Sequence, residues 1–261
     1  MDEYLEVNGI RLRYRVEGSG DWLVLIHGVG GRLEQWDRFV TLLDGKYRTL
    51  RFDQRGMGKS SKPAGPYHVD DFVADAYALT EALGVDRCVL AGCSLGALVA
   101  QGYALAHPEK LDKLILLAGI AGRTDEEKRK VQERLSIVAG GIPGAHFENS
   151  VVRWFTDEFR AKHPEVIAAY AASNRENDPK AYAAAYAVLA NTDFAERLHE
   201  ISMPTLIITG EHDQGSNPRM AHFMHEQIPG SQVCILPKLR HSLLIEGPRQ
   251  VLDVVEPFLH S

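Results

Sequence analysis

The sequence predicts an α/β protein with a mostly parallel β-sheet, helices on both faces of the sheet, and a helical cap inserted near the middle of the chain. Two observations support this fold class. Short strand-like runs alternate with helical patterns up to residue 121 and return after residue 199, as expected when helices connect neighbouring parallel strands. Between residues 122 and 198 the strand-like runs disappear and the periodicity is helical throughout.

The individual elements follow from their local patterns. Residues 10–16 alternate polar and apolar side chains like a half-exposed strand, whereas residues 22–26 form a continuous apolar run typical of a buried one. The further strands are predicted at residues 47–52, 87–91, 111–118, 204–209 and 232–236. Helices are predicted at residues 70–83, 95–106, 219–227 and 249–259. The chain is therefore expected to form a core, residues 1–121 and 199–261, with residues 122–198 as the cap.

Composition narrows the function classes. The 261-residue chain has a formal net charge of -6 with dispersed Lys and Arg, which argues against nucleic-acid or anionic-membrane partners and favours a small-molecule substrate. The acidic start lacks a signal-peptide pattern and no apolar run is long enough to span a membrane, so we expect a cytoplasmic protein. The sequence does not determine the oligomeric state, and a homo-oligomer is compatible with it. Cys88, Cys93 and Cys234 lack metal-ligand spacing and are expected to be free thiols.

Residues 92–96 read Gly-Cys-Ser-Leu-Gly and place Ser94 between a predicted buried strand and a predicted helix. This pattern is typical of a nucleophile elbow, a strained turn that exposes a serine hydroxyl. Gly92 and Gly96 are required because a Cβ atom at either position would collide with the neighbouring strand or helix. The helix behind Ser94 also directs its N-terminal amides toward an anion formed there. We therefore predict that Ser94 is a nucleophile.

A serine hydroxyl needs a base to take its proton and a third group to hold that base in the right tautomer. His241 follows the last predicted strand and emerges at the carboxyl edge of the sheet, where such sheets bind ligands. Asp213 lies in the loop after the strand at residues 204–209, at the same edge. Glu211 is the alternative acid, but it adjoins the turn and lies less far into the loop. The chain order Ser94, Asp213, His241 is that of a nucleophile-elbow triad.

A second glycine-rich segment predicts the oxyanion hole. Residues 27–31 read His-Gly-Val-Gly-Gly and directly follow the strand at residues 22–26. Because glycines let the backbone approach a substrate closely, we expect the amides of Val29 and Leu95 to be the two oxyanion donors. His27 is expected to hold this loop by hydrogen bonds rather than to act as a base. The segment lacks G-x-G-x-x-G spacing, and no P-loop lysine is present, which argues against a nucleotide site.

In order and spacing, these motifs resemble the α/β-hydrolase superfamily. The resemblance covers nearly the whole predicted core and rests on His27-Gly28 and on residues 53–60, 92–96, 210–213 and 240–242. It implies an eight-stranded, mostly parallel sheet with a helical cap, and a serine hydrolase. The motifs imply no metal and no cofactor.

Within the superfamily the chain resembles the 3-oxoadipate enol-lactonase group, through residues 53–60 and through the cap stretch Arg-Trp-Phe-Thr at residues 153–156. This resemblance favours hydrolysis of an ester, lactone or enol-lactone through an acyl-enzyme. We expect Arg153 and Trp154 in the cap, and Arg32 beside the oxyanion loop, to contact the substrate. The arginines favour a substrate that carries a carboxylate, because guanidinium groups bind carboxylates with paired hydrogen bonds.

The sequence leaves other activities open. Hydrolases that break a carbon–carbon bond in dienoate-type diketones share the fold, but they usually have asparagine where this chain has Cys93. Ala97 departs from the second glycine usual after the elbow. A lyase or a non-catalytic ligand receptor is a further alternative, although a receptor needs no triad. A dehalogenase or epoxide hydrolase is excluded because it requires a carboxylate in place of Ser94.

Overall fold

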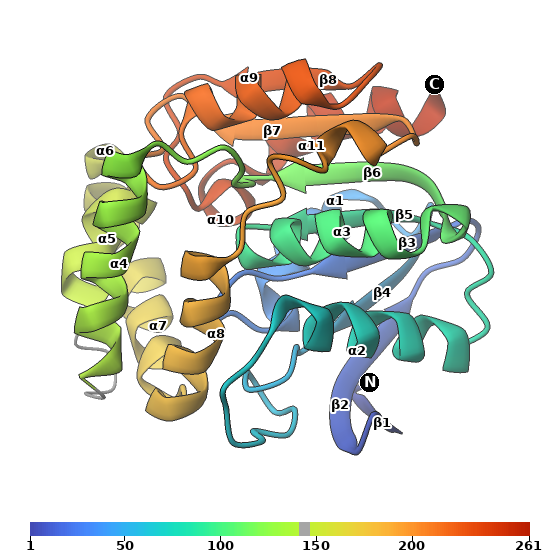
Figure 1. Cartoon of the computed structure of the whole chain (residues 1–261), viewed down its shortest axis with the longest axis horizontal. Coiled ribbons are helices and arrows are strands. Elements are labelled where there is room, and N and C mark those ends of the chain that lie inside the picture. The colour runs from blue at the N-terminus through green and yellow to red at the C-terminus, as the bar shows by residue number, and fades with distance from the viewer. Residues whose placement is uncertain (141–146) are drawn as a thin grey trace.

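A computed structural model describes residues 1–140 and 147–261 of the chain, apart from the side chain of Glu148. The described residues form an eight-stranded sheet in the order β1-β2-β4-β3-β5-β6-β7-β8 (Figure 1). The strands are β1 (Glu3–Val7), β2 (Ile10–Glu17), β3 (Trp22–Ile26), β4 (Arg48–Phe52), β5 (Cys88–Cys93), β6 (Leu111–Leu117), β7 (Thr205–Gly210) and β8 (Gln232–Leu236).

The sheet is mostly parallel, as the sequence predicted. The antiparallel pairs among the described strands are β1–β2 and β2–β4. The remaining neighbouring pairs are parallel: β4–β3, β3–β5, β5–β6, β6–β7 and β7–β8. The strands β3 and β5 carry no charged side chain, because helices cover both faces of the sheet there. The fold class predicted from the sequence is thus confirmed.

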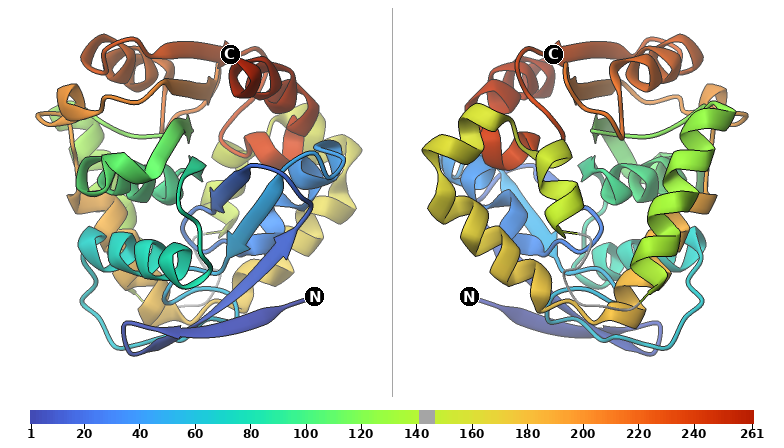
Figure 2. Two further views of the ribbon diagram at one scale, coloured as in Figure 1. Left: turned by 90° about the vertical axis from the view of Figure 1, so that its right-hand side faces the viewer. Right: turned by 90° about the vertical axis from the view of Figure 1, so that its left-hand side faces the viewer.

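Helices cover both faces of the sheet (Figure 2). The helices α2 (Val69–Ala82), α3 (Leu95–Ala106) and α9 (Pro218–Gln227) pack on one face. The helices α1 (Asp37–Leu42), α10 (Leu243–Glu246) and α11 (Pro248–His260) pack on the other. Short 3-10 turns lie at Leu33–Trp36, Pro108–Lys110 and Leu198–Glu200. The short elements β1, α1 and α10 were not predicted from the sequence.

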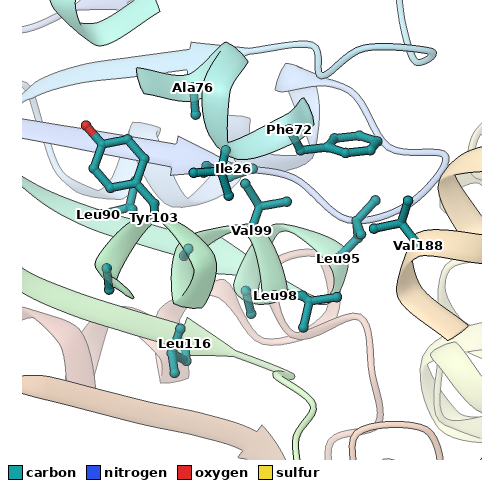
Figure 3. Packing of buried hydrophobic residues seen from close by; sticks show 14 of the residues in the cluster. Ile26, Phe72, Ala76, Leu90, Leu95, Leu98, Val99, Tyr103, Leu116 and Val188 are labelled. Carbon is teal, nitrogen blue, oxygen red and sulfur yellow. The ribbon is translucent and has the colours of Figure 1, made fainter. Parts of the chain in front are cut away.

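The buried cluster under α3 fixes the position of the elbow that precedes this helix. Leu98 and Val99 of α3 pack with Ile26 of β3 and Leu116 of β6, and Figure 3 shows these side chains meeting between the helix and the sheet. Burial of a leucine- or valine-sized side chain stabilises the fold by roughly 1.5–3 kcal/mol. The N-terminus of α3 is therefore held rigidly against the sheet.

In the described part of the segment predicted as the cap there are five α-helices, which stand beyond the carboxyl ends of the parallel strands (Figure 1). They are α4 (Asp125–Ala139), α5 (Phe147–Trp154), α6 (Asp157–Lys162), α7 (Pro164–Arg175) and α8 (Pro179–Asn191). Residues 141–146 of the predicted cap lie outside the described residues. The division of the chain into core and cap stays a prediction.

The helices of this segment differ in how they attach to the rest of the protein. Val188 and Ala185 of α8 belong to the same buried cluster as α3 and the sheet (Figure 3). The helices α5, α6 and α7 have an apolar cluster of their own, centred on Phe155, which is fully buried. The side chains of Thr124, Thr156 and Asp178 accept hydrogen bonds from amides in the first turns of α4, α6 and α8, which satisfies amides that lack a partner within the helix. In the described residues, no helix is both long and apolar enough to cross a membrane.

Candidate active site

Ser94 lies on a strained turn between β5 and α3. Its backbone has φ 57° and ψ -115°, a combination that residues with a side chain rarely adopt and that costs on the order of 1–3 kcal/mol. A Cβ atom on Gly92 would lie 2.1 Å from the carbonyl oxygen of Gly96, and one on Gly96 would lie 2.2 Å from the carbonyl oxygen of Ile26. Only glycine fits at these two positions, which agrees with the physical reason given for the motif.

Asp213 and His241 meet in space although 28 residues separate them. Asp213 follows β7, and its Oδ2 lies 2.6 Å from Nδ1 of His241. Its Oδ1 accepts hydrogen bonds from the amides of Gly215 at 2.7 Å and Ser216 at 3.0 Å. Burial raises the pKa of this carboxyl, but the charge and hydrogen bond of His241 and the two amides outweigh it, so the pKa of Asp213 lies below its ordinary value. Asp213 is therefore ionised at neutral pH.

The ionised carboxylate determines which nitrogen of His241 carries the proton. Because Oδ2 of Asp213 accepts only, Nδ1 of His241 is the donor and Nε2 keeps a free lone pair. His241, Asp213 and Ser94 line one cavity of about 80 Å³. Among the described residues no hydrogen bond joins Oγ of Ser94 to His241, but the cavity brings together a hydroxyl group and an imidazole nitrogen that is free to accept a proton.

Glu211, the alternative acid, does not take part in this arrangement. Its carboxylate accepts a hydrogen bond from the amide of Lys238 at 2.9 Å and lies 3.8 Å from Nε2 of His212. About half of its side chain is exposed to solvent (49%). The structure thus places Asp213, and not Glu211, beside His241.

The glycine-rich loop after β3 forms a tight turn next to Ser94. The amide of Gly31 donates to the carbonyl of Gly28 at 3.0 Å, and Gly30 has φ +67°, as the third residue of a type II turn requires. A Cβ atom on Gly28 would come within 3.2 Å of Cβ of Ser94. Val29, at the second position of this turn, lines the cavity together with Ser94.

His27 fixes the peptide that carries the Val29 amide. Its Nε2 accepts from the amide of Gln54 at 3.0 Å, so its Nδ1 is the donor to the carbonyl of Gly28 at 2.7 Å. Burial lowers the pKa of His27 and keeps the ring neutral. These bonds agree with the expectation that His27 holds the loop. Neither the Val29 nor the Leu95 amide donates a hydrogen bond to another described residue, which leaves both available to an oxyanion.

Arginines from the segment predicted as the cap line the same cavity. The set comprises Arg123, Arg134 and Arg153, together with Trp154 and Tyr186. Arg153 donates to Oγ of Ser150 at 2.7 Å and to the carbonyl of Asn149 at 3.3 Å, and no carboxylate among the described residues pairs with it. Burial, helped by the positive charge of Arg134, lowers the pKa of Arg153. Two carboxylates line the cavity as well: Glu127, which pairs with Arg219, and Asp213, which faces His241. Arg153 is thus a partly buried cation in the cavity without an ion pair to a described carboxylate.

Arg32 is not brought to this cavity. Its guanidinium pairs with Glu176 at 2.9 Å and donates to the carbonyl of Ser173 at 3.0 Å. It lines a second cavity of about 210 Å³ between the oxyanion loop and α7. Arg123 and Arg134 were not predicted from the sequence. Arg123 lies in the loop before α4, and for Arg134 a helical pattern shows which residues share a face but not which face meets the elbow.

The comparisons with known proteins agree with the fold and the motifs. A family model described as the α/β hydrolase fold matches residues 21–248, so the chain belongs to the α/β-hydrolase fold family. A 3-oxoadipate enol-lactonase of Acinetobacter baylyi is 28% identical over 97% of this chain and 94% of its own length. An (E)-2-((N-methylformamido)methylene)succinate hydrolase of the same organism is 27% identical over 97% and 96%. The crystal structure of an enol-lactonase from Burkholderia xenovorans is 26% identical, with a TM-score of 0.87 over 99% of this chain and all of that one.

Proposed function

We propose that this protein is a serine hydrolase that cleaves a carboxylic ester, lactone or enol-lactone through an acyl-enzyme. The observation that carries the proposal is the 2.6 Å contact between Asp213 and His241 in the cavity that Ser94 lines from a strained turn. Nucleophile, base and orienting acid are the three parts that serine catalysis needs. The enol-lactonase relatives support the same class of reaction.

Each residue has a defined part in the proposed mechanism. Oγ of Ser94 attacks the carbonyl carbon while its proton passes to Nε2 of His241, and the negative oxygen of the tetrahedral intermediate accepts from the amides of Val29 and Leu95. The bond to the leaving oxygen then breaks, and His241 donates its proton to that oxygen. A water molecule attacks the acyl-enzyme by the same route, which releases the acid and restores Ser94. Asp213 keeps the tautomer of His241 and stabilises its charged form.

The substrate we propose carries a carboxylate near the bond that is cleaved. Arg153 and Trp154 line the cavity from α5, and Arg134 adds positive charge from α4. A charge-assisted hydrogen bond away from bulk water contributes about 1.5–3 kcal/mol, or roughly tenfold to a hundredfold in kcat/KM. The names of the two Acinetobacter relatives contain 3-oxoadipate and succinate, which are both dicarboxylates.

The reaction class is tested by turnover of p-nitrophenyl acetate and of a panel of lactones and enol-lactones in ¹⁸O-labelled water. We expect hydrolysis, with one labelled oxygen in the acid product, and loss of turnover in Ser94→Ala with the fold unchanged. Binding without turnover would instead indicate a ligand receptor. Cleavage without label would indicate a lyase, and cleavage of a dienoate diketone alone would indicate carbon–carbon hydrolysis; each of these results contradicts the proposal.

The preference for a carboxylate is tested by comparing a half-ester substrate with its neutral methyl ester. In Arg153→Met we expect the ratio of the two kcat/KM values to fall about tenfold or more, because the guanidinium contact serves only the charged compound. Arg32→Met is the matched control, since Arg32 lies outside the cavity and pairs with Glu176. An unchanged ratio in Arg153→Met, or a wild-type preference for the neutral ester, would refute the carboxylate proposal.

A further inference from the structure

The connection between α7 and α8 reaches down to the oxyanion loop. Nδ2 of Asn177 donates a hydrogen bond to the carbonyl of Gly30 at 3.1 Å, and Asn177 is buried, with 9% of its surface exposed. Tyr182, in the first turn of α8, lies so close to Gly30 that a Cβ atom there would be 2.3 Å from its ring carbon Cε2. The start of α8 therefore contacts Gly30 both by a hydrogen bond and by packing.

Gly30 is the residue on which the shape of the oxyanion loop depends. Its φ of +67° sets the turn type, and its amide donates to Sδ of Met57 at 3.1 Å. The turn is closed by the bond from Gly31 to Gly28 at 3.0 Å, and it contains the peptide whose N–H belongs to Val29. The Gly30 carbonyl lies two peptides after the one that carries the Val29 N–H, and the bond from Gly31 to Gly28 links the two ends of the turn. A shift of the Gly30 carbonyl therefore reaches the Val29 amide through this closed turn.

The same group of helices also holds the loop that carries His241. The amide of Ser242 donates to the carbonyl of Trp154 at 2.9 Å. The guanidinium of Arg240 donates to the carbonyls of Val152 at 2.6 Å and Phe155 at 2.8 Å. The segment predicted as the cap is thus hydrogen-bonded both to the glycine-rich loop after β3 and to the loop that carries His241. It therefore contacts the loops of the site directly as well as covering the cavity.

We infer that Asn177 is a positioning residue for the reaction: its hydrogen bond to the Gly30 carbonyl holds one end of the turn, while His27 holds the Gly28–Val29 peptide at the other end, and both bonds are needed to direct the Val29 amide. The inference rests on the proposed hydrolase function. An oxyanion donor acts only if it lies within about 2.7–3.1 Å of the developing negative oxygen, and loss of a whole donor costs roughly 10²–10³ in kcat. A displaced donor costs less. We expect a fall of about tenfold to thirtyfold in kcat when the bond from Asn177 is removed.

The experiment compares Asn177→Asp with Glu176→Gln, using p-nitrophenyl acetate as substrate and phenylboronic acid as an analogue of the tetrahedral intermediate. Asn177→Asp keeps the size of the side chain but cannot donate to the Gly30 carbonyl. Glu176→Gln breaks the ion pair between Glu176 and Arg32. Glu176 lies next to Asn177 in the same connection, but this change removes no contact with Gly30. Asn177→Ala removes the donor without burying a carboxylate, and it replaces Asn177→Asp if circular dichroism shows that the latter does not fold.

For the Asn177 variant we expect kcat to fall at least tenfold, KM to stay within about twofold, and the inhibition constant of the boronic acid to rise by the same factor as kcat falls. Glu176→Gln is expected to keep all three values within about twofold of wild type. A kcat within twofold of wild type, or a change confined to KM, would overturn the inference. A hydrogen bond with only a structural role would affect the entry of substrate or the stability of the fold, and not kcat. Failure of the proposed function is a separate outcome: wild type itself would not turn over the ester, or Ser94→Ala would retain activity.

Discussion

Replacing Asp213 with asparagine changes the hydrogen bonds of this side chain while keeping its shape. Oδ1 of Asp213 accepts from the amides of Gly215 at 2.7 Å and Ser216 at 3.0 Å, so the carbonyl oxygen of an asparagine has to occupy that position. The new NH₂ group then faces Nδ1 of His241, where Oδ2 now lies at 2.6 Å. Two donors cannot share this contact. Nδ1 becomes the acceptor, and the proton of the neutral ring moves to Nε2.

An imidazole with its proton on Nε2 cannot accept the proton of Ser94. In serine hydrolysis, loss of the orienting carboxylate lowers kcat by about 10³–10⁴, which corresponds to about 4 to 5.5 kcal/mol of transition-state stabilisation. The depressed pKa of Asp213 means that wild type keeps the ionised carboxylate across the neutral range. The loss in Asp213→Asn should therefore be seen at every pH from 6 to 9 and should not be rescued by raising the pH.

Steady-state kinetics with p-nitrophenyl acetate measure this prediction, and thermal unfolding checks that the variant is folded. Glu211→Gln is the matched control, since Glu211 bonds to the amide of Lys238 and not to His241; we expect its kcat to stay within about tenfold of wild type. If Glu211→Gln lost more activity than Asp213→Asn, or if Asp213→Asn kept kcat within tenfold, the assignment of the orienting acid would be wrong.

Two further predictions concern the elbow itself. Burial raises the pKa of the Cys93 thiol to about 12, so the thiol stays protonated at pH 8 and should react with Ellman's reagent only after unfolding; fast reaction in the folded protein would contradict this. Gly96→Ala should lower the free energy of unfolding by about 2 kcal/mol or more in a urea titration, because the added Cβ would lie 2.2 Å from the carbonyl oxygen of Ile26. Gly140→Ala, whose Cβ would meet its first neighbour at 3.2 Å, is the control that should change little.

Much of the fold was predictable because the sheet and its helices have strong local patterns. The helix Leu95–Ala106 and the strand Trp22–Ile26 begin and end where the sequence predicts. The strand β1 was missed because it lies at the edge of the sheet, pairs only with β2, and has few buried side chains. An alternation or a run of apolar residues marks a strand that is buried on one or both faces of the sheet, and an exposed edge strand has neither pattern.

The environment of the site was less predictable. The loops after β3, β5 and β7 could be placed at one edge of the sheet because parallel strands end there together. The side chains that the cap contributes depend on how α4, α5 and α8 rotate and pack, which no short-range pattern determines. For this reason Arg153 was expected and lines the cavity, Arg134 was missed, and Arg32 lies elsewhere, paired with Glu176.

The proposed mechanism depends most directly on Ser94 as the nucleophile. Incubation of the folded protein with a fluorophosphonate, followed by intact mass and peptide mapping, measures whether one serine is modified and which. We predict a single adduct on Ser94 that forms in wild type, forms far more slowly in Asp213→Asn, and is absent from Ser94→Ala. An adduct on another residue, or equal labelling in Ser94→Ala, would contradict the proposed mechanism.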